Sequence, residues 1–203
     1  NGRGMEAMAQ LCHNQSLEFI IKDLMYYETT CRFPVGTITL ASDGTALAGL
    51  WLENQKYFGG TLNGEMAQKD DLPIFEKTVN WLERYFSGQN PAIGELPLAP
   101  AGKPFRQEVW KLLCDIPYGE TTTYGEIAQK MAVKLNKPGM SAQAVGGAVG
   151  HNPISIIIPC HRVVGSNGSL TGYAGGIDKK MWLLRHEGVN MEKLTVPVKG
   201  TAL

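Results

Sequence analysis

The chain has 203 residues, of which 43% are hydrophobic and 19% charged, and its formal net charge at pH 7 is zero. That length suits one large domain or two small ones, and the composition is typical of a soluble globular protein. No apolar run approaches the roughly 20 residues that a membrane helix requires. Residues 1–24 also lack the basic start, apolar centre and cleavage site of a signal peptide. We therefore expect a cytoplasmic protein without membrane contact.

Charge is unevenly divided between the two halves of the chain. Residues 1–102 contain 7 Lys and Arg against 12 Asp and Glu, a net of −5, whereas residues 103–203 contain 12 against 7, a net of +5. A polyanion would meet the second half. Five charges are few, however, and solvated surfaces that simply differ would give the same asymmetry.

The first part of the chain predicts a small α/β domain, residues 25–100, behind an N-terminal extension, residues 1–24. Apolar residues recur at helical spacing from Leu72 to Phe86, and Ser87–Gly102 has the Pro, Gly and Ala content of an interdomain linker. Three short β-prone segments separated by turn residues predict an antiparallel meander: Tyr26–Thr30, Gly36–Ala41 and Ala46–Leu52.

The second part, residues 101–192, is predicted to be mainly helical, and residues 193–203 form a tail. An apolar stripe at helical spacing predicts its first helix, which Pro117-Tyr118-Gly119 would end. The residues of that stripe are Phe105, Val109, Leu112, Leu113 and Ile116.

Two further helices form a helix-turn-helix candidate. Thr123-Tyr124-Gly125-Glu126 is a capping box that starts a helix running to about Met131. After the turn at Asn136–Gly139, Ser141 can cap a second helix, Ala142–Val149, which the residue before Pro153 would end. The second helix has almost no side-chain bulk, and each of its two glycines costs about 1 kcal/mol relative to alanine. Either tight helix packing or close approach of an outside partner would explain that composition.

A cysteine follows the most apolar stretch of the chain. Ile154–Ile158 is β-branched and predicts a buried strand that leads directly into Pro159-Cys160-His161-Arg162. A thiol beside an imidazole and a cation is a candidate nucleophile, because a free cysteine is only a few per cent thiolate at neutral pH and needs activation. A carboxylate such as Glu187, at the end of a predicted helix, can orient the imidazole.

The other cysteines and the glycine-rich loop carry no such pattern. Cys12, Cys31 and Cys114 are expected only to pack, and Cys12-His13 with Cys31 matches no standard zinc spacing, so no metal is predicted. The loop Gly165–Gly176 is followed by neither a Walker-type nor a dinucleotide motif. The sequence therefore predicts no cofactor.

Several segments together resemble the O6-alkylguanine-DNA alkyltransferases, also called methylated-DNA–protein-cysteine methyltransferases. The resemblance extends from about Tyr26 to Gly188 and is closest to the bacterial, constitutive type. The segments that carry it are Phe105–Trp110, Ala144–Ala148, Asn152-Pro153, Ile157–Val163 and the Gly172-Tyr173-x-Gly-Gly loop. It implies an α+β fold, in which a ribonuclease H-like domain precedes a winged helix-turn-helix-like catalytic domain.

The family resemblance also implies a reaction and four catalytic residues. Cys160 would accept a methyl or other alkyl group from O6-alkylguanine, and also from O4-alkylthymine, and would be consumed in a single turnover. His161 would activate the thiol through water while Glu187 orients the ring. Tyr124 would protonate the guanine ring nitrogen and rotate a phosphate, which helps to flip the base out of the duplex.

Base recognition and DNA contact are likewise implied by the resemblance. The carbonyl of Val163 and the amide of Ala174 would bind the flipped guanine, Tyr173 would shape the pocket, and Asn152 would brace the turn before the active site. The partner is double-stranded DNA bound through the minor groove by a monomer. Further DNA contacts are expected from Thr123, Gln143, Ala144, Gly147 and Arg162.

One position departs from the family pattern. Many members carry an arginine finger that fills the space left by the flipped nucleotide, and Gln143 stands there in this chain. Glutamine can hydrogen-bond the orphaned base but brings no charge to the DNA. The departure therefore bears on affinity and flipping, and not on the chemistry.

Two other functions are compatible with the same residues. A Cys-His-Glu thiol hydrolase is the alternative enzyme, although such hydrolases usually take their imidazole from a distant part of the chain. A non-catalytic lesion sensor would use the same helix-turn-helix, but the sensors that resemble this family lack the cysteine that is present here.

Overall fold

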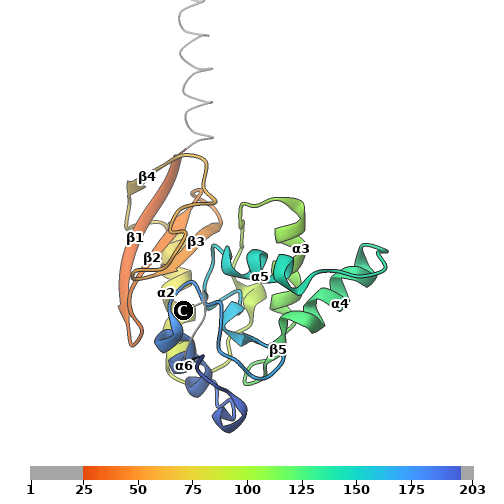
Figure 1. Ribbon diagram of the computed structural model, residues 1–203. Coiled ribbons are helices and arrows are strands. Elements are labelled where there is room, and N and C mark those ends of the chain that lie inside the picture. Colours follow the sequence, from red (N-terminus) through yellow and green to blue (C-terminus); the bar gives the residue numbers. More distant parts are fainter. Residues whose placement is uncertain (1–24, 198–203) are drawn as a thin grey trace, which may run out of the picture.

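A computed structural model describes residues 25–197 as a sheet domain followed by a helical domain (Figure 1). The fold is α+β, as the sequence predicts. The expected N-terminal extension, residues 1–24 with Cys12, and the last part of the expected tail, residues 198–203, lie outside the described residues. Within the described range, no helix combines the length and the apolar character that crossing a membrane requires.

The predicted meander is present, and a fourth strand joins it. Strands β1 (Met25–Phe33), β2 (Gly36–Ser42) and β3 (Leu47–Leu52) pair antiparallel in chain order. Strand β4 (Glu65–Gln68), which the sequence analysis missed, pairs parallel with β1, so the sheet is mixed with the order β3-β2-β1-β4. Its four residues are too few to show a period of their own, and pairing with β1 defines the strand.

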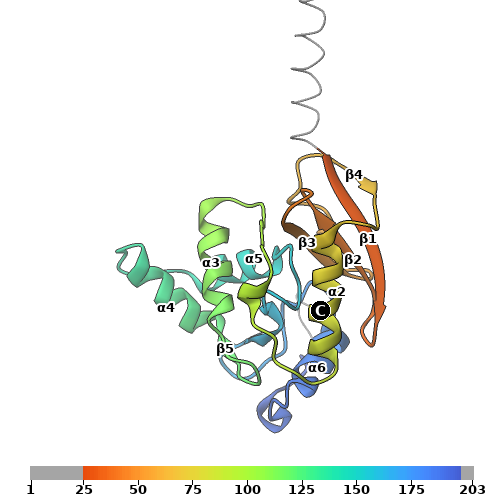
Figure 2. The ribbon, with the colours of Figure 1, turned by 180° about the vertical axis from the view of Figure 1, so that it is seen from behind.

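Helix α2 (Pro73–Phe86) lies across the sheet (Figure 2). Pro73 occupies the first turn, where a missing backbone N–H costs nothing. The helix matches the prediction from Leu72 to Phe86 within one residue. Its buried face consists of Ile74, Phe75, Thr78, Trp81, Leu82 and Tyr85.

The predicted linker Ser87–Gly102 is partly built into the sheet domain. It contains a short helix, η1 (Ile93–Glu95), and then runs beside β3. Leu47 of β3 donates its N–H to the Pro97 carbonyl over 2.8 Å and accepts from the Ala99 N–H over 2.8 Å. The connection is therefore held against the sheet edge by backbone hydrogen bonds.

The helical domain contains the predicted helix-turn-helix. Helix α4 (Tyr124–Lys134) starts after Thr123, whose side chain and that of Glu126 complete the capping box. Helix α5 (Ala142–Gly150) starts after Ser141, whose side chain caps it. The two helices contact each other and α3 (Pro104–Cys114). The elements in chain order are α3 (Pro104–Cys114), β5 (Thr122–Thr123), α4 (Tyr124–Lys134), α5 (Ala142–Gly150), η2 (Cys160–Arg162), β6 (Val163–Val164), α6 (Ile177–His186) and η3 (Met191–Lys193).

The segment Ile154–Ile158 is buried but is not the strand that its composition predicts. Its one ladder contact is a bridge from Ile154 to Leu50 of β3. Ile156 has a φ of 68°, a left-handed conformation that a β-branched residue rarely adopts. The apolar run therefore turns inside the core, and its conformation is set by tertiary contacts.

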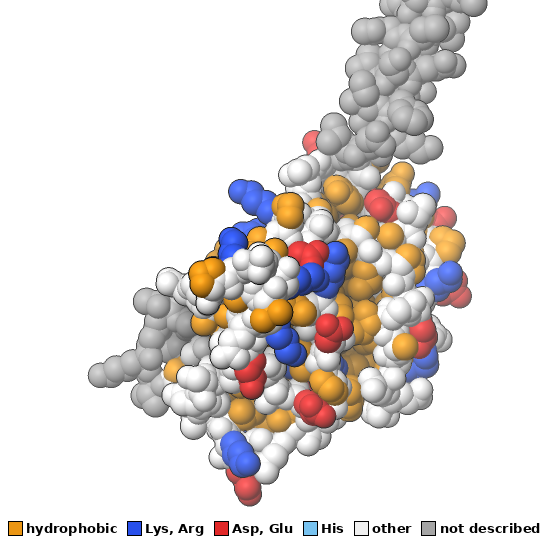
Figure 3. Space-filling view, turned by 90° about the vertical axis from the view of Figure 1, so that its right-hand side faces the viewer, with side chains coloured by type: hydrophobic (Ala, Val, Ile, Leu, Met, Phe, Trp, Pro, Cys, Tyr) orange, Lys and Arg blue, Asp and Glu red, His pale blue; other side chains and the backbone are white. Residues whose placement is uncertain are grey.

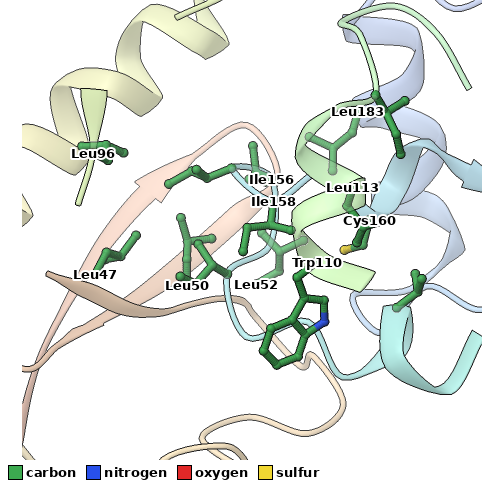
Figure 4. Close-up of a cluster of buried hydrophobic side chains, with 14 of the residues drawn as sticks. Leu47, Leu50, Leu52, Leu96, Trp110, Leu113, Ile156, Ile158, Cys160 and Leu183 are labelled. Carbon is green, nitrogen blue, oxygen red and sulfur yellow. The ribbon is translucent and has the colours of Figure 1, made fainter. Parts of the chain in front are cut away.

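One hydrophobic cluster joins the two domains. Leu47, Leu50 and Leu52 of β3 lie on one side of Ile156 and Ile158 in Figure 4, and Trp110, Leu113 and Cys160 lie on the other. The backbone connects them as well, since Leu50 donates to the Pro153 carbonyl and accepts from the Ser155 N–H. The sheet domain thus supports the segment that leads to Cys160.

Candidate active site

Cys160 is the first residue of η2 and is buried, with 5% of its surface exposed. Its Sγ accepts a hydrogen bond from Asn152 Nδ2 over 3.0 Å. The same amide group donates to the Ile158 carbonyl over 2.8 Å, and its oxygen accepts from the Ile154 N–H over 3.0 Å. Asn152 therefore fixes both the turning apolar segment and the thiol that follows it.

Two opposing influences act on the Cys160 thiol. Burial raises its pKa, while the Asn152 hydrogen bond and the positive charge of Lys180 lower it. Burial is the larger, so the pKa is raised in the protein without DNA. A nucleophilic thiol needs neighbours that favour the thiolate; Asn152 and Lys180 are such neighbours, but they do not ionise the resting thiol.

The pKa values of the other two cysteines of the described chain are dominated by burial, although the charge of Arg162 slightly opposes that effect at Cys114. Burial raises the pKa values of Cys31 and Cys114 to about 11. Both thiols therefore stay protonated and nonreactive at neutral pH. No group of three or more His, Cys, Asp or Glu among residues 25–197 is arranged to hold a metal ion.

His161 and Glu187 form a fully buried pair. His161 Nε2 lies 2.7 Å from Glu187 Oε1, and neither side chain is exposed. Burial lowers the pKa of His161, although the Glu187 carboxylate opposes that effect. The other ring nitrogen, Nδ1, is buried and has no hydrogen-bond partner among the described residues. The imidazole is therefore neutral, and its orientation is set by Glu187.

The Glu187 carboxylate receives more hydrogen bonds than the sequence suggested. Tyr85 Oη donates to Oε1 over 2.7 Å, Arg162 Nε donates to Oε2 over 2.8 Å, and a second Arg162 nitrogen donates to Oε1 over 3.0 Å. Burial alone would raise the pKa of Glu187, but hydrogen bonds from His161 and Arg162, together with the Arg162 charge, outweigh it and hold the pKa well below its usual range. Glu187 is therefore ionised.

Arg162 lies in the interior beside Glu187. Its side chain is buried, and its donors are directed to Glu187 and to the Ile116 carbonyl, 2.6 Å away. Its guanidinium is therefore directed into the interior, and the expected DNA contact of Arg162 stays a prediction. A buried carboxylate needs a cation or several hydrogen-bond donors, and Arg162 provides both to Glu187.

Lys180 is a site residue that the sequence analysis missed. Its side chain is fully buried on α6, and Nζ donates to the Val163 carbonyl over 2.6 Å and to the Thr171 carbonyl over 3.0 Å. Burial lowers its pKa to about 8, while the nearby Cys160 opposes that effect. A signal existed, because Lys180 shares a helix face with the buried Leu183 and Leu184, where an unpaired lysine is rare.

Tyr124 opens α4 and is held toward the loop that follows β6. Its hydroxyl donates to the Thr171 carbonyl over 3.0 Å. Gly172 has a φ of 75°, and a Cβ there would lie 2.7 Å from the Tyr124 hydroxyl oxygen. Only glycine allows this approach. Burial raises the pKa of Tyr124, so its hydroxyl is protonated.

A pocket of about 190 Å³ lies between α5 and this loop. One wall comes from the sheet domain, where the Lys56 N–H donates to the Ala174 carbonyl over 3.0 Å and the Tyr57 ring stacks on His151 with centroids 4.0 Å apart. Sequence reasoning did not anticipate this wall, because the segment after β3 has no motif. The other lining residues are Gly146, Gly147, Gly150, Gly172 and Tyr173.

Helix α5 presents a face of exposed residues, two of which are small. Gln143, Ala144 and Gly147, here called the α5 face, are all exposed, whereas Ala148 on the opposite side accepts a hydrogen bond from the buried Trp110 indole. A Cβ on Gly147 would meet no atom within 4 Å. Helix packing within the described chain therefore does not explain this glycine.

The expected charge asymmetry does not give the side of α3 and α4 a single sign. Basic, acidic and hydrophobic side chains are interspersed there (Figure 3). Glu108 on α3 pairs there with Lys111, at 2.7 Å, and with Lys134 of α4. Two of the lysines of the second half are therefore paired with an acidic residue on this side.

These features define a two-domain protein with a buried thiol, a His–Glu pair and an adjacent helix-turn-helix. Two family models match the chain: the ribonuclease-like domain of 6-O-methylguanine DNA methyltransferase over residues 25–100, and its DNA binding domain over residues 104–189. The chain belongs to the 6-O-methylguanine DNA methyltransferase family.

Individual relatives agree with this assignment. The methylated-DNA–protein-cysteine methyltransferase of Haemophilus influenzae is 41% identical over 175 residues, which cover 86% of this chain and 90% of the relative. That of Mycobacterium tuberculosis is 43% identical and covers 80% and 93%. The crystal structure of Mycobacterium tuberculosis OGT in complex with DNA matches with a TM-score of 0.67 at 42% identity, covering 81% of this chain and 92% of that one.

Proposed function

We propose that this chain repairs DNA by direct reversal, transferring an alkyl group from O6-alkylguanine to Cys160 in a single turnover. The observation that carries the proposal is the placement of a buried, hydrogen-bonded thiol next to the His161–Glu187 pair, behind a helix-turn-helix. The names of the relatives, methylated-DNA–protein-cysteine methyltransferases, support the same reaction. O4-alkylthymine is proposed as a second substrate.

The reaction is a displacement at the alkyl carbon. Cys160 loses its proton to His161 through a bridging water, and Glu187 stabilises the imidazolium that forms. The thiolate attacks the alkyl carbon, the carbon–O6 bond breaks, and its electron pair stays with guanine. Tyr124 donates a proton to the ring nitrogen of the leaving base. The thioether product is not hydrolysed, so Cys160 is consumed.

Lys180 gives the thiolate an electrostatic partner. Its charge already favours ionisation of Cys160 in the resting protein. In a pocket from which a bound base excludes water, the same charge acts through a lower dielectric and has a larger effect. We infer that base binding and thiol ionisation occur together, because burial suppresses the thiolate before the base arrives.

The protein is proposed to bind double-stranded DNA as a monomer, with the α5 face in the minor groove. Gln143 would enter the stack in place of the flipped base, while Ala144 and Gly147 would allow close approach of the backbone. Thr123, the cap of α4, lies at the neighbouring helix start. The complex of the Mycobacterium tuberculosis relative with DNA supports a DNA partner. The catalytic unit is proposed to span residues 101–192, without a cofactor.

The flipped guanine is proposed to occupy the pocket beside α5. Tyr173 and Ala174 line it, and the Val163 carbonyl, which accepts a hydrogen bond from Lys180, is proposed as an acceptor for the base. A carbonyl oxygen has two lone pairs, so Val163 can accept from Lys180 and from the base at once. Flipping costs a few kcal/mol, which contacts in the pocket must offset.

The test is incubation of pure protein with a duplex that carries O6-methylguanine labelled in its methyl group. Wild type is expected to acquire one label per chain, on the peptide that contains Cys160. Cys160→Ala should acquire none and should bind the duplex within a few-fold of wild type, with Cys114→Ala as a matched control that retains transfer. Binding without transfer by wild type would indicate a lesion sensor, and ester cleavage without transfer would indicate a thiol hydrolase.

A further inference from the structure

One buried hydroxyl at the thiol site comes from the sheet domain. Tyr85 lies in the last turn of α2, is 1% exposed, and donates from Oη to Glu187 Oε1 over 2.7 Å. The two residues are 102 positions apart in the chain. Figure 2 shows the end of α2 beside α6, where this contact is made.

The Tyr85 ring is held on several sides. It stacks on Trp81 with centroids 5.6 Å apart and an interplanar angle of 10°, and it meets the Tyr118 ring edge-on at 6.1 Å. Its backbone carbonyl lies 2.7 Å from His186 Nε2, next to Glu187 in the chain. Because both ring and backbone are held, the hydroxyl has a defined position relative to the carboxylate.

The hydroxyl bonds the carboxylate oxygen that also faces the imidazole. Glu187 Oε1 lies 2.7 Å from Tyr85 Oη and 2.7 Å from His161 Nε2. Arg162 holds the other oxygen, Oε2, through its Nε. Tyr85 and Arg162 thus fix the carboxylate from two directions, so that Oε1 stays aligned with the imidazole.

We infer that Tyr85 is a positioning residue for alkyl transfer, through which the sheet domain holds the Glu187 carboxylate in line with His161. This inference rests on the proposed function of Cys160. It gives the sheet domain a part in the reaction beyond supporting the fold. The burial of Tyr85 and the charge of Glu187 raise the pKa of its hydroxyl well above the usual range, so it remains a donor at every pH used in an assay.

Removal of the Tyr85 hydroxyl should shift the pH dependence of transfer in a defined direction. A hydrogen bond to a carboxylate stabilises its charged form. Without Tyr85 Oη, the carboxylate attracts the proton on His161 more strongly, so the pKa of His161 rises. A base must be unprotonated to act, so the acidic limb of the rate profile moves to higher pH. The titratable and charged groups around the pair are Tyr85, Tyr118, Cys160, Arg162, Tyr173, Lys180 and His186.

The experiment compares Tyr85→Phe with Tyr118→Phe, which removes a hydroxyl from the same aromatic cluster without touching Glu187. Tyr118 Oη makes a long bond, 3.4 Å, to the His186 carbonyl. Single-turnover transfer is measured on the labelled duplex and on free O6-benzylguanine from about pH 5.5 to 9. We expect Tyr85→Phe to be slowed about tenfold on both substrates, as loss of a bond to a charged group implies, with its acidic midpoint raised. Tyr118→Phe should match wild type.

Two results would overturn the inference. One is a Tyr85→Phe transfer rate equal to that of Tyr118→Phe. The other is a slower Tyr85→Phe rate whose acidic midpoint does not move, because that result would reflect a structural effect alone. Absence of transfer by wild type would instead refute the proposed function. The two failures are therefore distinguishable.

A double variant covers the case in which Tyr85→Phe does not fold. Glu187→Gln removes the charge that needs the donor, so Tyr85→Phe/Glu187→Gln leaves no unpaired carboxylate in the core. If Tyr85 acts through Glu187, the double variant and Glu187→Gln alone should transfer at the same rate. A further tenfold loss in the double variant would mean that Tyr85 acts elsewhere, and the inference would be wrong.

Discussion

The thiol site and the α5 face lie close together in the chain but are held in different ways. Cys160, His161 and Glu187 are buried, and hydrogen bonds from the protein fix the thiol and the His161–Glu187 pair. Gln143 and Gly147 are exposed, and a Cβ on Gly147 would meet open space. The protein alone therefore defines the geometry of the thiol site, whereas the α5 face lacks such contacts within the described residues.

This contrast predicts that variants of the two regions differ in the substrates on which their transfer rates change. Substitutions in the thiol site change the rate on every substrate, including a free base that needs no flipping. Substitutions on the α5 face change only what happens on a duplex. Variants that break this division would show that the two regions are coupled before DNA binds.

The largest effect after loss of Cys160 is expected from Glu187→Gln. Glutamine keeps the shape but removes the charge that orients His161 and stabilises its protonated form. Transfer should slow on the order of 10²–10⁴-fold, equally on a duplex and on free O6-benzylguanine. Glu108→Gln is the matched control, because that carboxylate forms ion pairs on the surface of α3, where such pairs contribute little to stability.

Thermal melting accompanies this measurement, since Arg162 loses its charged partner in the core. If Glu187→Gln folds and transfers at the wild-type rate, Glu187 has a purely structural role. A loss on the duplex alone would move Glu187 from the chemistry to DNA binding and would remove the division between the regions.

Gln143→Ala is expected to have a smaller effect that depends on the substrate. If Gln143 holds the flipped base out of the stack, its loss makes the flipped state less favourable. A loss of about 1.4 kcal/mol corresponds to a tenfold slower rate. Transfer should slow about tenfold on a duplex and remain unchanged on free O6-benzylguanine. Gln129→Ala, an exposed glutamine on α4, is the control. Equal loss on both substrates would mean that Gln143 supports the pocket itself.

Local signals in the sequence predicted the features that residues close in the chain determine, such as the starts of helices. The Thr123 capping box and the Ser141 cap start α4 and α5 as expected, because each cap satisfies backbone donors within four residues. For the His161–Glu187 pair, the residues suggested only that such a carboxylate can orient the imidazole, and the family resemblance specified the pair, since nothing local brings residues 26 apart into contact.

Contacts between segments far apart in the chain determine the features that the sequence did not predict. The run Ile154–Ile158 has the composition of a strand, but Asn152 and β3 hold it in a turning conformation. Arg162 has the charge of a DNA ligand, but a buried carboxylate 25 positions away takes its donors. Tyr85 resembles any aromatic residue on a buried helix face, and its hydroxyl partner lies in the other domain.

Gly147→Ala is expected to have the smallest effect and to separate stability from function. An exposed glycine inside a helix costs about 1 kcal/mol relative to alanine, and the space around Gly147 accepts a Cβ. The variant should therefore raise the free energy of unfolding by about 1 kcal/mol. If DNA approaches the α5 face closely, the added methyl should also weaken binding to an undamaged duplex about fivefold, as about 1 kcal/mol of overpacking implies.

Gly94→Ala is the matched control, because Gly94 in η1 also has open space around it but lies in the sheet domain. Its DNA affinity should equal that of wild type. Chemical denaturation measures stability, and titration of an undamaged duplex at fixed salt measures affinity without involving the thiol site. A Gly147→Ala protein that is more stable and binds DNA as tightly as wild type would remove the reason proposed for the glycine. The small residues of α5 would then need an explanation other than close approach of DNA.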